Sequence, residues 1–469
     1  MRSRHSNDTT HQFPGSGFIR RRSRLGRSAA ILMALGLGAA ACGSGGAASG
    51  SGSSSNASQN GGGGGGSGSS LTVAVVGPFT GKDASLGPPY LAACLASTRA
   101  INQAGGVMGH QLTCKSVDTR GDPADAIPAV RKLFASSSNL AAIIGVTSDT
   151  AASIVPVINN NKTVMFAMTG QSEFDHKHFK YFYRLVPPDL EEGRALVAIA
   201  KQKHYSKVAL AFGNDIGSQT FVKPALASLK KENITVTANE TLNLSANTFR
   251  TEASRIVSSH PQAILTEALG PAEATFLSEV KQLNGGKLIP VIATGATVTP
   301  SWYKAVSSAV GAKALSNAYS ADQLAVKTSG SAYKVYKTNM TAIKGKLKGR
   351  AGNFSALLTS DGAIHLYDGI NLAALSMLKA KSVSPATYQK DIVPIANGTS
   401  GATVVQSFAQ GKKALSQGKT IRYVGPGGKT HFDSYHDSKG IFQVVHYSPS
   451  GNVNVVGNIS HAQLNAVTP

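Results

Sequence analysis

The stretch Ala141–Asn160 reads AAIIGVTSDTAASIVPVINN and contains the pattern that decides the fold. Ala141–Ile144 is a short apolar run typical of a buried strand, and Gly145 predicts a turn after it. The next polar residues are Thr147, Ser148, Asp149 and Thr150, and the apolar spacing of a helix comes after them. A helix that starts directly after a strand has backbone N–H groups without intrahelical partners, which can hold an anionic or polar ligand group. The alternative interpretation is that Ser148 or Asp149 only caps the helix.

Strands and helices alternate on both sides of this stretch. Leu71–Val76 (LTVAVV) is a near-continuous apolar run, as expected of a strand covered on both faces. The pattern predicts further strands over 111–117, 163–167 and 182–186, and helices over 88–103, 123–136 and 150–160. This alternation predicts an α/β fold with a doubly wound parallel sheet.

A second series begins after the break Pro187-Pro188-Asp189. The pattern predicts strands over 207–212, 234–238, 263–265 and 288–293, and helices over 190–203, 217–231, 249–258 and 272–283. A chain of 469 residues is long enough for two lobes of ordinary size, so we expect a second lobe built like the first.

The N-terminal residues predict secretion rather than a folded element. A basic region, Arg20–Arg27, precedes an apolar segment, Ala29–Ala41, that is too short to span a membrane comfortably. Residues 1–41 are therefore expected to be a signal peptide, and the Gly/Ser-rich residues after Cys42, up to residue 70, a flexible tether. The sequence Ala-Ala-Ala-Cys-Gly ending at Gly43 resembles the lipobox of bacterial lipoproteins, although Ala39 stands where Leu is usual. That resemblance implies a lipid on Cys42 and anchoring to the outer face of the cell membrane; the alternative is a plain secretion signal with a chance cysteine.

The two remaining cysteines, Cys94 and Cys114, fall on the first expected helix and the strand that follows it. Outside the cytoplasm they could form a disulfide, and two buried free thiols are the alternative.

The positive charge does not indicate a nucleic-acid partner. The formal net charge is +22, and seven Arg and one Asp precede Cys42, which leaves +16 for the rest of the chain. The remaining Lys and Arg are scattered, whereas nucleic-acid binders cluster them on one face or helix. We therefore expect no nucleic acid among the partners.

The motifs that suggest chemistry are incomplete. Gly77–Asp83 (GPFTGKD) is one residue short of a phosphate-binding loop, and Asp83 stands where a hydroxyl would bind magnesium. His176 and His178, like His431 and His436, lack a third metal ligand at a convincing spacing. We expect no metal, no cofactor and no enzymatic activity.

Four motifs occur in a recognisable order: Gly77–Gly81 (GPFTG), Ile101–Gly109 (INQAGGVMG), Asp118–Pro123 (DTRGDP) and Ile144–Thr150 (IGVTSDT). Together they resemble the periplasmic binding proteins that serve ABC importers of leucine, isoleucine and valine. The resemblance runs from about residue 71 to 457. It implies two Rossmann-like lobes joined by three crossings, the type I periplasmic-binding-protein fold. The first lobe would comprise 71–187 with 319–439, and the second 188–318 with 440–469.

This family captures a small polar solute, such as an amino acid or an amide, between two lobes that close about a hinge. The resemblance therefore implies delivery of the solute to an ABC permease in the membrane, by a protein that we expect to be a monomer. A ligand-sensing lipoprotein of the same fold, which signals to a partner instead, is the alternative.

The resemblance also implies ligand residues on both lobes. In the first lobe, Ser148 and Thr150 carry over as donors to a ligand carboxylate, and Asp149 departs from the small hydroxyl residue that is common there. The loop after the next strand supplies Thr169, Gly170 and Gln171.

In the second lobe Asp215 aligns with a ligand loop, in which Ile216 replaces an aromatic residue. Amino-acid binders place an acidic residue near Thr294 to hold the ligand ammonium. None stands there in this chain, and Glu267 on the neighbouring strand could substitute.

Overall fold

The structure, a computed structural model, describes residues 69–81, 83–268, 270–323, 328–347, 354–439 and 442–469. The expected signal peptide, Cys42 and the tether up to Gly68 lie outside the described residues. None of the helices in the described part of the chain is long and apolar enough to cross a membrane.

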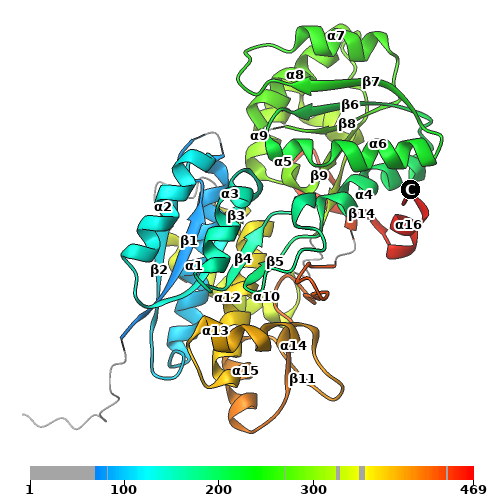
Figure 1. Cartoon of the computed structure of the whole chain (residues 1–469). Coiled ribbons are helices and arrows are strands. Elements are labelled where there is room, and N and C mark those ends of the chain that lie inside the picture. The colour runs from blue at the N-terminus through cyan, green and yellow to red at the C-terminus, as the bar shows by residue number, and fades with distance from the viewer. Residues whose placement is uncertain (1–68, 82, 269, 324–327, 348–353, 440–441) are drawn as a thin grey trace, which may run out of the picture. The chain divides into compact units, whose positions relative to one another are not determined.

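The first sheet has five strands, all parallel, in the order β2-β1-β3-β4-β5 (Figure 1). Val73 and Val75 on β1 pack into the core under one set of helices, and Ala74 and Val76 into the core under the other. Because both faces are covered, the strand reads as an unbroken apolar run rather than an alternating one. The strands are β1 (Leu71–Gly77), β2 (Leu112–Asp118), β3 (Leu140–Thr147), β4 (Met165–Met168) and β5 (Phe182–Arg184); one face carries α1 (Gly87–Gln103), α10 (Ser331–Ile343) and α12 (Asp361–Ala380), the other α2 (Pro123–Ala135) and α3 (Ser148–Asn160).

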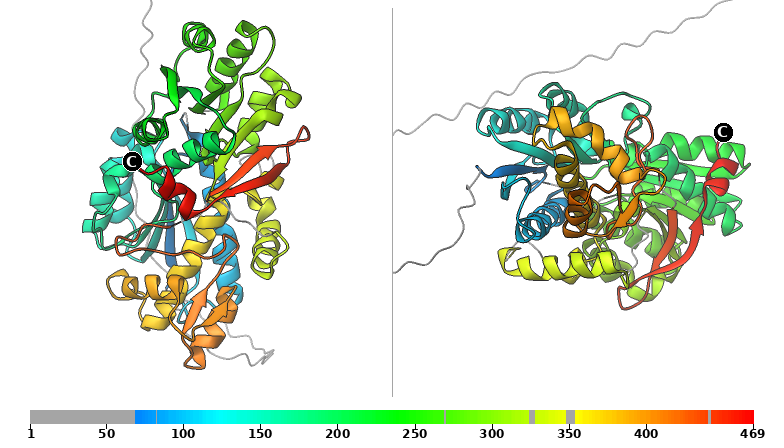
Figure 2. Two further views of the ribbon diagram at one scale, coloured as in Figure 1. Left: turned by 90° about the vertical axis from the view of Figure 1, so that its right-hand side faces the viewer. Right: turned by 90° about the horizontal axis from the view of Figure 1, so that it is seen from below.

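The second sheet has seven strands in the order β14-β13-β10-β9-β8-β6-β7. Its pairs are parallel from β7 to β10, and the C-terminal hairpin β13–β14 adds two antiparallel strands at one edge (Figure 2). The strands are β6 (Lys207–Gly213), β7 (Thr235–Leu242), β8 (Ala263–Glu267), β9 (Val291–Thr294), β10 (Ala318–Asp322), β13 (Phe442–Tyr447) and β14 (Val453–Ile459); the faces carry α4 (Asp189–Gln202), α6 (Val222–Lys231) and α16 (His461–Ala466) on one side and α7 (Arg250–Ser258), α8 (Gly270–Leu283) and α9 (Pro300–Val310) on the other.

The expected fold class, α/β with two doubly wound Rossmann-like lobes, is confirmed. The sheets differ from the expected lobe division at one strand. β10 lies wholly in the second sheet, whereas the expected boundary at residue 319 assigned most of it to the first lobe.

The helix expected over 217–231 is two helices, α5 (Ile216–Gln219) and α6. Pro224 explains the division, because it lacks the N–H that a helix interior would bond. It stands in the first turn of α6, where that N–H needs no intrahelical partner.

Several short elements around α12 were not predicted from the sequence. They are α11 (Phe354–Leu357), α13 (Pro385–Tyr388), α14 (Ile392–Asn397), α15 (Phe408–Ser416) and a two-stranded parallel sheet of β11 (Thr403–Val405) and β12 (Ile421–Tyr423). These segments are too short for periodicity to identify them.

Gly145 is a bulge inside β3 and not the turn that ends the strand. Ile144 pairs with Phe166 and Val146 with Ala167, so Gly145 is the extra residue of the bulge, with φ at +92°. The strand continues to Thr147, which is the N-cap residue of α3. The alternative interpretation, in which Ser148 or Asp149 is the N-cap residue, does not hold, since both lie in the first turn of the helix.

Cys94 on α1 and Cys114 on β2 form a disulfide that spans 20 residues of sequence. It links a helix to the edge strand of the first sheet.

We expect Gly145→Ala to lower the free energy of unfolding by about 1–3 kcal/mol. A Cβ at this position would lie 2.9 Å from Tyr90 Cδ2 and 3.0 Å from the Val76 carbonyl oxygen, in a backbone conformation that alanine disfavours. Urea unfolding followed by circular dichroism measures the loss. Gly286→Ala is the control, because Gly286 has a φ of +80° and a Cβ added there would meet no atom within 4 Å. Equal losses in the two variants would contradict the role given to packing around the bulge.

Candidate ligand-binding site

Polar side chains meet at the carboxyl ends of β3 and β4. Thr147 pairs with Met168, so the residues that follow them, Ser148 and Thr169, lie side by side. The Ser148 and Thr169 hydroxyl oxygens are 3.1 Å apart, and the Thr169 hydroxyl donates to Gln171 Oε1 at 3.4 Å. The structure therefore brings together three of the residues that the sequence assigned to the first lobe's part of the site.

Two other predicted residues of this lobe are hydrogen-bonded to backbone groups of the protein. Thr150 is fully buried, and its hydroxyl donates to the Thr147 carbonyl oxygen at 3.4 Å. Gly170 accepts a hydrogen bond from the Asp189 N–H at 2.7 Å, and a Cβ at Gly170 would lie 2.0 Å from Asp189 Oδ1. Gly170 is thus required for close approach of α4. Asp149 lies in the first turn of α3, where a carboxylate interacts favourably with the helix dipole.

In the second sheet, a cluster of acidic and hydroxyl residues lies at the carboxyl ends of β6, β8 and β9. Asp215 caps α5, with Oδ1 accepting from the Ser218 N–H at 2.9 Å. The Ser218 hydroxyl donates to Glu267 Oε1 at 3.4 Å, and the Thr294 hydroxyl donates to Glu267 Oε2. Burial raises the pKa of Glu267 well above its ordinary value, although the bond from Thr294 acts in the opposite direction. The predicted second-lobe residues therefore form one hydrogen-bonded group.

Two acidic residues on α4, Asp189 and Glu192, were missed in reasoning from the sequence. The Asp189 carboxylate accepts from the Thr220 hydroxyl at 2.7 Å. Glu192 Oε1 accepts from the Gly295 N–H at 2.6 Å, and Oε2 from Gln323 Nε2 at 3.0 Å. Burial raises the pKa of Asp189 to about 7 and that of Glu192 to about 8. Asp189 directly follows the two prolines of the lobe break, but nothing in the local sequence indicates its burial or that of Glu192.

Further carboxyl groups extend this acidic region. Asp361, at the start of α12, is hydrogen-bonded to Asp322 at the end of β10, and burial together with the Asp322 charge raises the pKa of Asp361. Glu192 and Asp189 also raise the pKa of Glu267. A region in which carboxyl groups raise one another's pKa is complementary to cations and hydrogen-bond donors.

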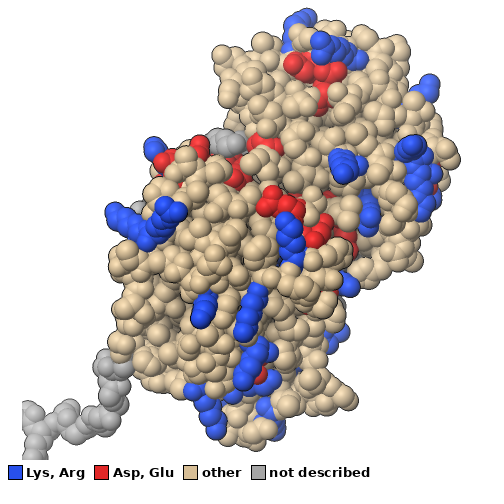
Figure 3. Space-filling view, in the orientation of Figure 1, with Lys and Arg blue, Asp and Glu red and all other residues tan. Residues whose placement is uncertain are grey.

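Figure 3 shows that Lys and Arg elsewhere on one face lie in small groups and do not form a single stripe.

The polar residues of the first sheet (Ser148, Thr169 and Gln171) and the acidic residues of the second face each other at the starts of α3 and α5. A Cβ at Gly217 would lie 3.8 Å from Ser148 Cβ. Ile216 is 47% exposed beside this contact. Within the described residues, no group of three or more His, Cys, Asp or Glu is placed to hold a metal ion.

Residues 70–401 match the family model described as "Periplasmic binding protein". This match covers most of the chain, and the chain therefore belongs to the periplasmic binding protein family. Membership implies an extracytoplasmic location and a solute-binding role. The relatives named below are binding proteins and not enzymes.

One curated relative is "Leu/Ile/Val-binding protein homolog 3" of Brucella melitensis, 26% identical over 101 residues. The match covers 21% of this chain and 27% of that protein, so the chain spans about a quarter of the relative's length.

Solved structures share the fold over nearly their whole length. The branched-chain amino acid substrate-binding protein LivJ of Streptococcus pneumoniae, in complex with isoleucine, is 15% identical with a TM-score of 0.64, covering 83% of this chain and 99% of that one. The leucine-binding protein LivK of Thermotoga maritima is 18% identical with a TM-score of 0.65, covering 84% and 99%. A solute-binding protein of Rhodopseudomonas palustris in complex with p-hydroxybenzoic acid is 17% identical with a TM-score of 0.65, covering 85% and 98%.

We expect Glu192→Gln to flatten the dependence of stability on pH between about 4.5 and 8. Because the pKa of Glu192 is about 8 in the folded protein and 4.5 ordinarily, the folded state keeps a proton that the unfolded state releases in this interval. Its contribution to stability is fully present below pH 4.5 and is lost as the pH rises toward 8. Thermal unfolding measured at a series of pH values tests this.

The amide of Glu192→Gln can keep both hydrogen bonds, since Gln323 has a buried Oε1 without a partner and can turn to accept from it. Glu173→Gln, at an exposed position, is the control. A profile for Glu192→Gln that falls as steeply as that of the wild type would show that Glu192 does not hold this proton.

Proposed function

We propose that this protein is an extracytoplasmic, lipid-anchored solute-binding protein that captures a small polar solute between its two lobes for an ABC permease. The observation that carries the proposal is the pair of hydrogen-bonding groups at the carboxyl ends of two parallel sheets: Ser148, Thr169 and Gln171 on one, and Asp215, Glu267 and Thr294 on the other. In open α/β sheets, ligands bind at this edge. Closure of the lobes around the solute is the expected motion.

The chemistry of the two groups favours a solute that carries a protonated amine. Hydroxyl and amide groups on the first sheet suit a carboxylate or another polar group, while Glu267 offers a carboxylate to a cation. Glu267 would then take the role that relatives give to an acidic residue on the neighbouring strand. Although the Rhodopseudomonas palustris protein binds an aromatic acid, the acidic second group disfavours such a solute here.

The lobe division belongs to the same proposal. The first lobe would comprise 71–187 with the residues after β10 up to 439, and the second 188–322 with 440–469, because β10 pairs within the second sheet.

We expect thermal stabilisation by at least one solute in a panel of L-leucine, L-arginine, L-glutamine, putrescine, urea and benzoate. A solute at a hundred times its Kd stabilises the folded state by about 2.7 kcal/mol. The proposal also requires that the solute is recovered chemically unchanged. If no member of the panel shifts the unfolding of folded protein, or if one is consumed, the proposal fails.

For a solute that binds, Ser148→Ala and Thr169→Ala should each weaken the affinity about 3- to 10-fold, the effect of one hydrogen bond. Isothermal titration calorimetry measures this. Ser153→Ala is the matched control on the same helix, because the Ser153 hydroxyl donates only along α3, to the Thr150 carbonyl oxygen. Glu267→Gln should weaken binding of L-leucine or putrescine more than binding of benzoate. Equal affinities in the wild type, Ser148→Ala and Ser153→Ala would place the solute elsewhere.

The lipid anchor is tested separately with Cys42→Ser. We expect the wild-type protein, expressed in a bacterium, to partition into detergent and the membrane fraction, and the variant to be released, because two acyl chains anchor a protein stably. Mass spectrometry of the N-terminal peptide is the direct measurement. An unmodified Cys42, or a variant that fractionates like the wild type, would contradict the anchor and leave the binding proposal standing.

A further inference from the structure

Arg184, the last residue of β5, is fully buried and contacts two other segments, one containing Gln171 and Asp175 and the other containing Asp437. Its Nε is 2.6 Å from Asp437 Oδ1, and its Nη2 is 2.6 Å from Asp175 Oδ1. Its Nη1 donates to the Gln171 carbonyl oxygen at 3.0 Å. The guanidinium therefore uses each of its three nitrogens on a different residue, in a fixed planar geometry that a lysine ammonium, with all its donors on one atom, does not reproduce.

One partner segment is the ligand loop of the first lobe. The Gln171 carbonyl oxygen that Arg184 holds also accepts from the Phe174 N–H at 3.1 Å. Gln171 in turn contacts Thr169, which lies against Ser148. The position of this loop backbone thus depends on the Arg184 guanidinium.

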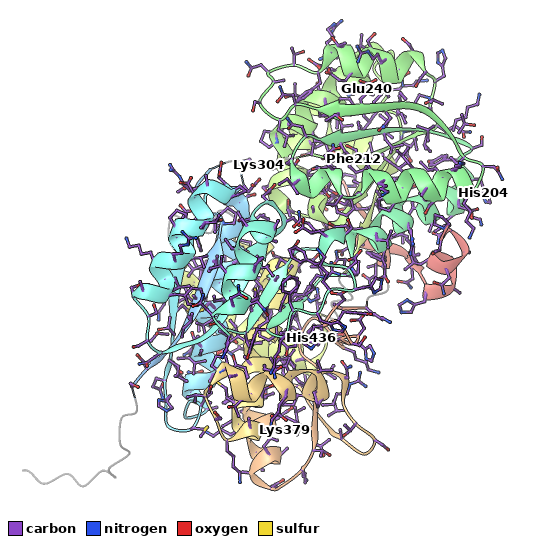
Figure 4. The ribbon with its side chains drawn as sticks, viewed as in Figure 1. His204, Phe212, Glu240, Lys304, Lys379 and His436 are labelled. Atoms are coloured by element: carbon purple, nitrogen blue, oxygen red, sulfur yellow. A yellow bond between two sulfur atoms is a disulfide. The ribbon has the colours of Figure 1, made fainter. Side chains whose placement is uncertain are left out.

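The other partner segment is Phe432–Ser438, which precedes the crossing to β13 in the second sheet. Besides the ion pair with Asp437, the Arg184 N–H donates to the His436 carbonyl oxygen at 3.0 Å. Figure 4 labels His436 in this segment. The His436 ring stacks on Tyr183 at 4.3 Å between centroids, and its Nδ1 is 3.2 Å from the Phe182 carbonyl oxygen. The crossing segment is therefore fastened to β5.

The same network lies at the start of the first crossing. Arg184 is followed by Leu185–Pro188, and then Asp189 begins α4 in the second lobe with its N–H bonded to the Gly170 carbonyl oxygen at 2.7 Å. The Arg184 guanidinium thus lies beside the first crossing, beside the segment Phe432–Ser438 that leads to another crossing, and beside the ligand loop Thr169–Gln171.

The energetics indicate positioning more than net stabilisation. Burial lowers the pKa of Arg184, but the hydrogen bonds and charges of Asp437 and Asp175 outweigh it and leave the pKa raised. A buried ion pair gains little net stability, because desolvation offsets the attraction, but it fixes geometry. An open surface hollow of about 280 Å³, lined by residues including His178 and Tyr435, borders the crossing segment. The ion pair with Asp437 restrains this segment together with the core packing of Phe432 and its two hydrogen bonds to Asn397.

We propose that Arg184 is a positioning residue that couples the ligand loop Thr169–Gln171 to the crossing segment Phe432–Ser438, so that movement at the hinge changes the geometry of the loop. The functional meaning rests on the proposed solute-binding role. The test needs no solute, so its failure and a failed solute screen are separate results.

The test is hydrogen–deuterium exchange of the full chain carrying Asp437→Asn. This change removes the charge and preserves the size of the side chain. We expect the amides of residues 168–175 to exchange at least 10-fold faster, although they are distant in sequence from the substitution, because Arg184 loses one of the two carboxylates that hold it. Asp437→Glu, which keeps a carboxylate, should restore most of the protection. In an Arg184→Lys background, Asp437→Asn should have little further effect on these amides.

Asp391→Asn is the matched control, because it breaks another ion pair, between Lys379 Nζ and Asp391 Oδ1 at 3.3 Å. It should leave exchange at 168–175 unchanged. Wild-type exchange at 168–175 in folded Asp437→Asn, or an equal rise in Asp391→Asn, would overturn the coupling. If Asp437→Asn does not fold, Asp175→Asn provides the reverse measurement: faster exchange over 432–438 supports the coupling, and unchanged exchange overturns it.

Discussion

Parallel pairing of strands is the constraint on which the rest of this structure depends. When two strands run in the same direction, the residues that follow both of them lie at the same edge of the sheet. The pairing of Thr147 with Met168 is the reason why Ser148 and Thr169 touch, although 21 residues separate them. In the second sheet the same geometry lets Ser218 connect Asp215 to Glu267, and lets Thr294 donate directly to Glu267. Helices cover both faces of each sheet, which leaves this edge for a ligand.

Buried carboxyl groups are the second theme of the molecule. Asp189, Glu192 and Glu267 are all nearly inaccessible, and burial raises the pKa of each. A buried carboxylate without a cation is costly, and it either keeps a proton or receives hydrogen bonds. Both occur here, since N–H and hydroxyl donors reach Glu192 and Glu267 while their pKa values stay high. Such a region becomes more favourable when a solute brings a positive charge, which is the physical basis for preferring an amine.

Arg184 shows the opposite arrangement, in which one buried cation satisfies several acceptors. Asp437 is distant from Arg184 in the chain, whereas Asp175 and the Gln171 carbonyl group belong to the stretch that begins with the ligand loop. A residue with this many fixed contacts restrains the segments that it joins more than it stabilises the lobe. Arg184 therefore contacts both the crossing segment and the ligand loop, which links the motion of a two-lobed binding protein to its site.

The sequence by itself determined the fold class and most elements of the two sheets, because valine-rich strands and periodic helices are local patterns. Its resemblance to the binding-protein family also predicted Ser148, Thr169, Asp215 and Glu267 as ligand residues, and their role in binding stays a prediction. The tertiary structure decided which of them meet. It assigned the Thr150 hydroxyl to the helix backbone, moved β10 into the second sheet and made Gly145 a bulge, because register and pairing involve contacts between distant segments. The roles of Asp189, Glu192 and Arg184 could be recognised only there, because an acidic or basic residue gains its function from burial and from partners that local sequence does not specify.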